Sequence, residues 1–329
     1  MSQTLRRRLM LSMAALAVAP TAAHAQKGRP TLRIATLEDG SLEARRLAWQ
    51  TFQKRMRALG YEEGSRFVLQ RYYGGDTPEQ LRERAKDIVA SNPDILIAAS
   101  TGAAQAAMQA TSSIPILFLG ASDPVGSGLV ASLAQPGGNV TGLANSAAEL
   151  GAKWLELALE LAPRMRRIGL VTDTRNPGSV LVFRRTEKEA KARGVSLQMF
   201  GALPRAELEK SFQAMVAART DGLIVTFAST LLVHREAIVR FAAERKMPAV
   251  YGRREYVDAG GLASYGIDVN LIYVRAADYV HRIAGGEKPA TLPVEQPDIF
   301  RLTLNRKTAR ELGLTISAGT LQRADAVIE

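Results

Sequence analysis

The chain has 329 residues, of which 47% are hydrophobic and 23% are charged, and its formal net charge is +11. This length exceeds a single ordinary core and suits two lobes of about 100–200 residues each. Because the chain contains no cysteine, the sequence excludes structural disulfides, thiolate metal sites and a lipid anchor attached through cysteine. The composition is that of an ordinary soluble globular protein.

The first 25 residues have the pattern of an export signal. Three arginines at 6–8 precede an apolar segment at 9–19, and an A-x-A cleavage sequence ends at Ala25. The apolar segment is too short to span a bilayer, which takes about 20 residues. We predict cleavage after Ala25 and a soluble periplasmic chain that is not a lipoprotein and begins at Gln26. The general secretory and twin-arginine routes both remain open.

The basic residues do not form the pattern of a nucleic-acid surface. Loss of the signal lowers the net charge from +11 to +8, because residues 1–25 contain three arginines and no acid. A nucleic-acid surface gathers basic residues together with aromatic ones. Here they alternate with acids, as at 82–84 and 187–189. We interpret these stretches as solvated helix faces. We expect neither a nucleic-acid partner nor membrane insertion, since no later stretch is apolar enough to span a bilayer.

Strand and helix patterns alternate from residue 32 onward. A capping box of Thr77 and Gln80 around Pro78 predicts the start of one helix, and Gly60 predicts the end of another. This alternation is typical of a parallel sheet with helices on both faces. Apolar runs predict strands at 32–37, 67–73, 95–98, 116–119 and 139–143, with a loop at 38–41. Towards the end we predict a helix at 270–283, an extended proline-containing connection, a strand at 298–304 and helices at 305–312 and 321–328.

The second half of the chain repeats the pattern of the first at offsets of 126–134 residues. Matches in the same order include Ile34 with Ile168, and Ile114-Pro115 with Met247-Pro248. The repeat predicts an α/β fold of two similar lobes, each a parallel sheet flanked by helices, with a ligand cleft between them that closes about a hinge. We assign 31–144 and about 267–297 to the first lobe, and 146–265 and about 298–329 to the second. The chain should cross near Asn145, Gly266 and Pro297.

The sequence does not favour catalysis or a cofactor. Residues 126–131 fit the dinucleotide fingerprint G-x-G-x-x-A, but 121–125 separate them from their strand, where the fingerprint should follow directly. Outside the signal, His234 and His281 have no paired metal-binding spacing. No G-x-S-x-G elbow is present. We therefore expect no catalytic residue, no metal and no cofactor.

Candidate ligand-binding residues follow strands, because open α/β sheets bind ligands at strand carboxyl ends. The central stretch 114–146 contains such an end, where Ser122 and Asp123 follow an apolar run. Asp123 could pair with a ligand ammonium or cap the turn at Pro124. Ser100, Thr101 and Gly102 begin a helix, where N–H groups and hydroxyls can bind a carboxylate, although Ser100 or Thr101 could serve only as a cap.

The second lobe has corresponding strand ends. We predict ligand contacts from Asp173, Ser229, Thr230 and Tyr251. Tyr251 could cover an apolar or aromatic part of the ligand. Arg253 could instead form an ion pair between the lobes.

These segments resemble a known family, the ABC transporter substrate-binding proteins whose characterised members bind tryptophan, tyrosine or related aromatic amino acids. The resemblance runs from about residue 32 to 329 and is densest at 122–130 and 136–142, with further matches at 251–261 and 292–297. It implies a type I periplasmic binding fold in which residues near strand ends of both lobes hold the ligand. One departure is the charged loop at 37–41, where relatives often have an uncharged one.

The resemblance predicts the periplasmic solute-binding component of an ABC importer. Such a protein binds a small molecule, here an amino acid, including aromatic ones, or a related carboxylate, and delivers it to an inner-membrane permease. We expect a monomer without enzymatic activity. Two alternatives remain open: a periplasmic ligand-sensing input protein, which would signal to a kinase or cyclase, and an enzyme on the same lobes.

Overall fold

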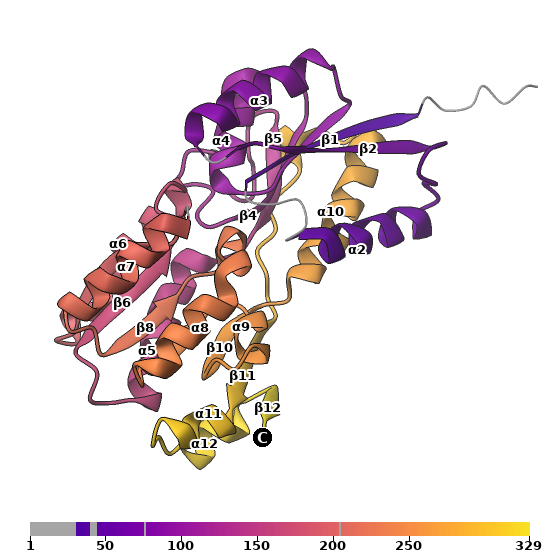
Figure 1. Ribbon diagram of the computed structural model, residues 1–329. Helices are drawn as coiled ribbons and strands as arrows, with labels where there is room; N and C mark the ends of the chain where they lie inside the picture. Colours follow the sequence, from indigo (N-terminus) through magenta and orange to yellow (C-terminus); the bar gives the residue numbers. More distant parts are fainter. Residues whose placement is uncertain (1–30, 40–44, 76, 204) are drawn as a thin grey trace, which may run out of the picture. The chain divides into compact units, whose positions relative to one another are not determined.

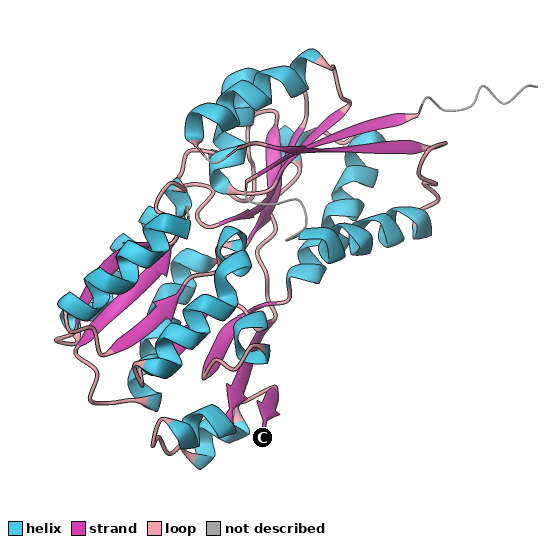
Figure 2. Cartoon of the chain, viewed as in Figure 1, coloured by secondary structure: helices cyan, strands magenta, loops and turns pink. Residues whose placement is uncertain are grey.

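The computed structural model describes residues 31–39, 45–75, 77–203 and 205–329, without the side chains of Ala148 and Ser229. The predicted export signal lies outside the described residues. Two sheets with helices on both sides make up the described chain (Figures 1 and 2). The prediction of two α/β lobes is therefore confirmed.

The first sheet has five described strands, all parallel, in the order β2-β1-β3-β4-β5. Each predicted strand of this lobe is present within one or two residues of its predicted bounds. The strands are β1 (Leu32–Glu38), β2 (Phe67–Tyr73), β3 (Ile95–Ala98), β4 (Ile116–Ala121) and β5 (Val140–Ala144). The helices that pack on them are α2 (Arg46–Ala58), α3 (Pro78–Ala90), α4 (Thr101–Ala110) and α10 (Val269–Ala284).

Strand periodicity divides the first lobe into two cores. Successive side chains of a strand point to opposite faces, so Ile95 and Ile97 belong to one buried cluster and Leu96 and Ala98 to another. One cluster includes apolar residues of α2 and α10, the other those of α3 and α4, and Figure 1 shows these pairs of helices on opposite sides of the sheet. Because both faces are covered, nearly every residue of β3 and β4 is apolar.

The second sheet has seven described strands in the order β12-β11-β10-β9-β8-β6-β7. They are β6 (Arg167–Thr172), β7 (Ser196–Gly201), β8 (Gly222–Val225), β9 (Ala249–Tyr251), β10 (Ala263–Ile267), β11 (Phe300–Asn305) and β12 (Ala326–Ile328). Helices of this part are α5 (Ala147–Leu161), α6 (Pro177–Ala192), α7 (Arg205–Ala217), α8 (Arg235–Glu244), α9 (Glu255–Asp258), α11 (Arg306–Glu311) and α12 (Ala318–Gln322). Short 3-10 helices are η2 (Ser229–His234) and η3 (Pro289–Thr291).

Strand β11 runs antiparallel to its neighbour β10, so the second sheet is not wholly parallel as predicted. After β10 the chain forms α10, which packs on α2, β4 and β5 of the first sheet. Glu295 then pairs with the edge of β5 before the chain returns. Strand β11 starts opposite the end of β10, where Phe300 pairs with Ile267, so it runs back along β10.

The predicted helix at 321–328 is wrong. Helix α12 ends at Gln322, and Ala326–Ile328 form β12, which pairs in parallel with β11. The short run Ala-Val-Ile has β-branched residues that suit a strand. The open edge of β11 offers unpaired backbone groups to complete that pairing. Only the fold reveals that this edge is within reach.

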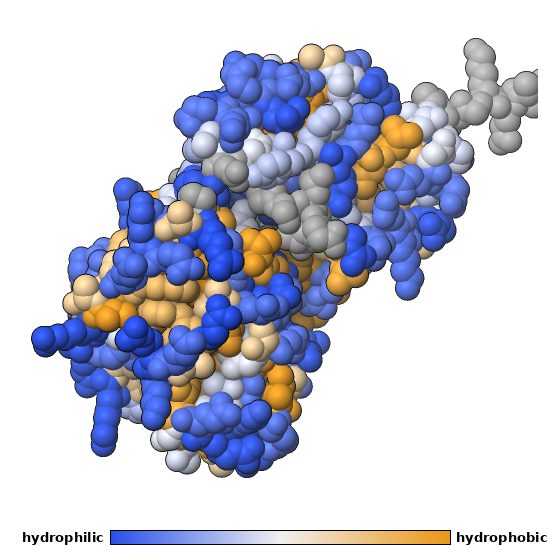
Figure 3. Space-filling view, viewed as in Figure 1, coloured by the Kyte–Doolittle hydropathy of each residue, from blue (hydrophilic) through white to orange (hydrophobic). Residues whose placement is uncertain are grey.

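On the face drawn in Figure 3, hydrophilic side chains cover most of the described surface. The large apolar side chains that are exposed are scattered along the chain, among them Leu47, Val233 and Leu271. Within the described ranges, no helix combines the length and the apolar character needed to cross a bilayer.

Candidate functional site

A cavity of about 60 Å³ lies where strand ends of both sheets meet. Loops after β1, β3, β4, β5, β6 and β8 form its walls, as expected for an α/β sheet. This volume is room for about four to six water-sized groups, enough for the head group of an amino acid. The lining residues are Asp39, Arg45, Ala99, Ser100, Leu119, Gly120, Ser122, Asn145, Ala147, Asn176, Ser179, Val182, Thr226, Phe227, Ala228, Thr230, Val269, Ile272 and Tyr273.

Several helices begin at this cavity. Ser100 is the N-cap of α4 and accepts a hydrogen bond from the Ala103 N–H at 3.1 Å. Asn176 is the N-cap of α6 and accepts one from the Gly178 N–H at 3.0 Å. Helix α5 begins with Ala147, another lining residue. Helix starts carry partial positive charge and free N–H groups, so the cavity favours an anionic group such as a carboxylate.

Asn145 connects the end of β4 to the start of α5. Its amide nitrogen donates to the Gly120 carbonyl at 2.7 Å, and its Oδ1 accepts from the Ala147 N–H at 2.9 Å. Gly120 has φ +72 and lies where the pairing of β4 with β5 shifts register. The backbone adopts a positive φ at this position, which glycine does without steric cost.

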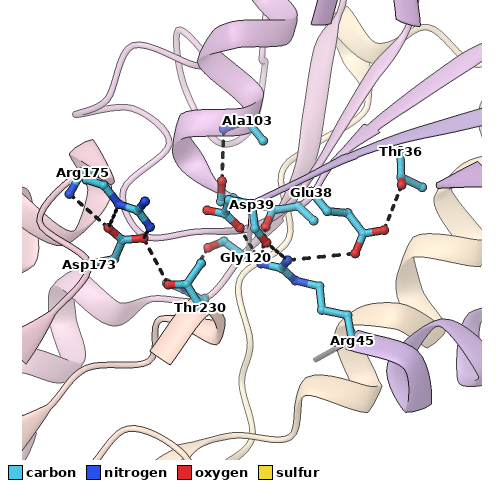
Figure 4. A network of polar contacts seen from close by, with 12 residues as sticks. Thr36, Glu38, Asp39, Arg45, Ala103, Gly120, Asp173, Arg175 and Thr230 are labelled. Atoms are coloured by element: carbon cyan, nitrogen blue, oxygen red, sulfur yellow. Dashed lines mark hydrogen bonds and ion pairs between the residues drawn. The ribbon is translucent and has the colours of Figure 1, made fainter. Parts of the chain in front are cut away.

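A buried ion pair forms part of the wall (Figure 4). Arg45 Nη2 donates to Asp39 Oδ1 at 2.6 Å and to the Ala99 carbonyl at 3.0 Å, and Nη1 donates to the Asp39 carbonyl. Asp39 and Arg45 are each 7% exposed. Burial lowers the pKa of Arg45, but Asp39 and other nearby groups outweigh it and raise the pKa above its usual value. The guanidinium therefore stays charged.

Glu38, the residue before Asp39, forms a second ion pair with Arg71 of β2. The carboxylate of Glu38, which is 0% exposed, accepts from Arg71 Nε at 2.7 Å and Nη2 at 3.0 Å. It also accepts from Trp49 Nε1 and the Thr36 hydroxyl, each at 3.0 Å. We call Glu38, Asp39, Arg45 and Arg71 the first-sheet charge cluster. Its formal charges cancel, which is the condition under which buried charges are tolerated.

Phe227 and Tyr273 are the aromatic residues among those that line the cavity. Burial raises the pKa of Tyr273 to about 12, so its phenol stays protonated and can donate a hydrogen bond. Tyr251, predicted to cover the ligand, does not line the cavity. It is buried in the second-sheet core and stacks on Tyr256 with ring centroids 4.8 Å apart.

The structure brings Ser100, Ser122 and Thr230 together in the cavity wall. Thr101 and Gly102 lie in the first turn of α4 but do not line the cavity. The start of α6 covers this turn, because a Cβ added to Gly178 would lie 2.6 Å from Thr101 Oγ1 and 3.1 Å from Ser122 Oγ. The side chain of Ser229 lies outside the described part of the chain.

Asp173 supports the wall without lining it. Its Oδ1 accepts from Arg175 Nε at 2.9 Å, and its Oδ2 accepts from Arg175 Nη2 at 3.1 Å. The Thr230 hydroxyl also donates to Oδ2, at 3.2 Å. Asp173 is 3% exposed, so these contacts fix the position of Thr230 in the cavity.

Asp123 does not line the cavity either. Its Oδ1 accepts from the Gly126 N–H at 2.9 Å, and its Oδ2 accepts from Arg185 Nη2. The first contact closes the turn at Pro124, the alternative role that the sequence left open. The second joins the loop after β4 of the first sheet to α6 of the second. Ligand contact by Asp123 stays a prediction.

Sequence reasoning missed several lining residues. Asp39 follows β1 just as Ser100 follows β3, so the strand-end rule that found Ser100 would also have found Asp39. Arg45 and Tyr273 belong to the starts of α2 and α10, and no local signal shows how deeply those helices reach. Within the described residues, no three His, Cys, Asp or Glu side chains are placed to hold a metal ion.

The chain is similar to known proteins in both sequence and structure. A family model described as ABC transporter substrate binding protein matches residues 34–328. By sequence, the chain is 27% identical over 263 residues to the tyrosine-binding protein of Clostridioides difficile strain R20291, covering 80% of this chain and 75% of that protein.

Two crystal structures are similar over almost the whole chain. A conserved domain protein from Vibrio cholerae has a TM-score of 0.82 and 31% identity, with 90% of this chain and 99% of that chain covered. An ABC domain from Streptococcus pneumoniae in complex with L-Trp has a TM-score of 0.81 and 26% identity, with 91% and 100% covered.

Proposed function

Because the chain belongs to the family of ABC transporter substrate-binding proteins, we propose that it is the solute-binding component of an ABC importer and binds a small carboxylate-bearing solute in the cavity described above. Proteins of this family bind small ligands and work with membrane permeases, and they are not enzymes. Beyond family membership, we propose a class of ligand, closure of the lobes about a hinge, a membrane permease as partner and a periplasmic location.

One observation supports the ligand class most directly. The starts of α4, α5 and α6 meet at the cavity, and the buried Arg45 lines the same wall. Partial charges at helix starts and a buried guanidinium both attract a carboxylate. The polar groups that surround them, from Ser100, Ser122 and Thr230, can complete the hydrogen bonds of a small head group.

Two relatives support amino acids as members of that ligand class. One is named as a tyrosine-binding protein, and another is solved with L-Trp. We propose an amino acid, with aromatic ones included, or a related carboxylate. Phe227 and Tyr273 offer aromatic surface for an apolar side chain.

We further propose that the lobes comprise 31–144 with 267–297, and 146–265 with 298–329, and that they close over the solute as a hinge. The contact between Asp123 and Arg185, and the close approach of Gly178 to Thr101, connect these segments and support this proposal. The pattern at residues 1–25 supports export to the periplasm, where an inner-membrane permease would receive the solute.

A thermal-shift screen of the exported protein tests the proposal. The panel contains L-amino acids, small carboxylates and, as a control of different chemistry, neutral sugars. A ligand present at 100 times its dissociation constant should add about 2.7 kcal/mol of stability. X-ray scattering should then give a smaller radius of gyration with that ligand. Stabilisation by sugars alone would contradict the ligand class, and an unchanged radius at saturation would contradict hinge closure.

A further inference from the structure

We infer that Asp39 and Arg45 form a subsite that selects zwitterionic ligands, with the Asp39 carboxylate accepting the ligand's ammonium group. This inference rests on the proposed function and deepens it. The proposed function leaves amino acids and simple carboxylates as equal candidates, and the subsite favours the amino acid.

The charged residues of the cavity wall point to this role. Among the lining residues that the structure describes, Asp39 is the one carboxylate and Arg45 the one cation. Two other carboxylates that could contact an ammonium, those of Asp173 and Asp123, do not line the cavity and form ion pairs with arginines. Asp173 bonds to Arg175 and Thr230, and Asp123 bonds to Arg185.

Electrostatics then distinguishes the two ligand classes. In the first-sheet charge cluster, Glu38 is paired with Arg71 and Asp39 with Arg45, so the wall has no net formal charge to offer a bare anion. A simple carboxylate would gain from the helix starts but would leave the occupied site with one net negative charge, because the charges of the wall already cancel one another. A zwitterion presents an ammonium to Asp39 and a carboxylate to the helix starts. No buried charge then lacks a partner, which is the arrangement that burial favours.

The geometry leaves Asp39 able to accept this second partner. Arg45 Nη2 contacts Oδ1, while Nη1 contacts the backbone carbonyl of the same residue. A carboxylate offers about four acceptor positions, so one side-chain contact does not exhaust it. The double contact of Arg45 also fixes the position of the carboxylate, and Figure 4 shows Asp39 beside the guanidinium of Arg45.

Calorimetry with matched probes tests the inference on the wild-type protein. Each pair differs only in the ammonium group: L-tyrosine and 3-(4-hydroxyphenyl)propionate, L-tryptophan and indole-3-propionate, L-alanine and propionate. We expect at least one amino acid to bind roughly 30-fold or more tightly than its partner, the loss typical when one member of a buried charge pair is removed. Equal binding within every pair that binds would overturn the inference but leave the proposed function standing.

Failure of the proposed function looks different. If no member of any pair binds, the carboxylate class itself is wrong, and the subsite inference falls with it. A cationic analogue such as L-tyrosine amide keeps the ammonium and loses the carboxylate charge. Binding of the amide alone would contradict the proposed ligand class and not the ammonium contact.

Variants then assign the preference to Asp39. Asp39→Asn keeps the shape but removes the charge, so the ratio within a pair should fall from about 30 or more to near one, while the propionate should bind no more weakly. Asp87→Asn is the matched control, because it removes an exposed carboxylate that pairs with Arg84 and does not line the cavity, and it should keep the wild-type ratio. A wild-type ratio in Asp39→Asn would overturn the assignment. Should that variant misfold, the wild-type ratios still decide the zwitterion preference.

Discussion

Asp39 and Asp123 occupy similar local positions, and their side chains are 10% and 13% exposed, but their arginine partners differ in depth. Each follows a strand of the first sheet, and each accepts a hydrogen bond from an arginine side chain. Asp39 lines the cavity, and its partner Arg45 is 7% exposed. Asp123 lies outside the lining, and its partner Arg185 is 51% exposed. A strand end brings a carboxylate to this edge of the sheet, but the packing of its arginine partner decides whether the ion pair lies in the cavity wall or faces solvent.

The difference in depth also sets the energies. Water and salt screen an exposed pair, which contributes about 0–1 kcal/mol. A buried pair contributes little net stability, yet removal of one partner costs about 3–5 kcal/mol because the remaining charge has no compensation. Variants at the two depths should therefore differ strongly, and the following predictions run from the largest effect to the smallest.

The largest effect should come from Arg71→Met, which removes the main partner of the fully buried Glu38. We expect the free energy of unfolding to fall by about 3–5 kcal/mol, because the buried carboxylate loses its two hydrogen bonds from a guanidinium and keeps only the more distant Arg45, at 4.0 Å. Denaturant titration followed by circular dichroism measures it. Arg82→Met is the control, since its pair with Glu79 is exposed and should contribute about 0–1 kcal/mol. Equal losses in both variants would contradict the importance of depth.

A smaller effect should follow from Gly178→Ala, which tests the contact between the two lobes. The added methyl would lie 2.6 Å from Thr101 Oγ1, so closure must displace atoms. Overpacking of this kind costs about 1–3 kcal/mol, which corresponds to a loss of affinity of about 5- to 150-fold. Calorimetry with the amino acid found in the screen measures the affinity.

The unfolding free energy of ligand-free Gly178→Ala should not fall, because an open protein has no clash and alanine favours helices. Gly138→Ala is the control, since a Cβ there meets nothing within 4 Å. Unchanged affinity in Gly178→Ala would mean that ligand binding does not require this close approach of α6 to α4.

The ion pair between Asp123 and Arg185 should have a smaller effect on ligand affinity. Asp123→Ala, Arg185→Ala and the double variant form a cycle whose coupling we expect at about 0–1 kcal/mol, or up to about fivefold in affinity. The coupling should disappear at high sodium chloride, because Arg185 is half exposed. A tenfold or greater loss in Asp123→Ala that salt does not reduce would instead indicate direct ligand contact by Asp123, as the sequence alone predicted.

The smallest effect should come from another partly exposed ion pair, Arg275 with Glu295. This pair tests whether solvent exposure is enough to make an ion pair contribute little to stability. The hydrogen bond from Arg275 holds the pKa of Glu295 below its usual value. A carboxyl whose pKa is lowered by folding stabilises the protein above its unfolded pKa of about 4.3. That contribution is lost as the pH falls through the folded value.

Glu295→Gln should therefore reduce the loss of unfolding free energy on acidification below about pH 4.3, by less than about 1 kcal/mol. Denaturant titrations at a series of pH values measure the slope. Arg275→Gln should remove the same part of the slope. A change in the free energy of unfolding larger than that of Arg71→Met would contradict the ranking of ion pairs by burial.

The same contrast explains how much could be predicted. The strands of the first lobe and the capping box at Thr77 followed from local patterns, because apolar periodicity and capping chemistry act over a few residues. The strand-end rule located Ser100, Ser122 and Thr230 in the cavity wall. The same rule selected Tyr251, which does not line the cavity, because its ring stacks on Tyr256 in the core.

By itself, the sequence determined that this protein has two α/β lobes and which residues stand at strand ends. Only the tertiary structure decided which of those residues reach the cavity. Asp39 meets Arg45 there because α2 packs against the first sheet, and Tyr273 reaches the wall because α10 returns to that sheet after β10. Local patterns act within a few residues, whereas the cavity is made by side chains that the fold brings together from both lobes.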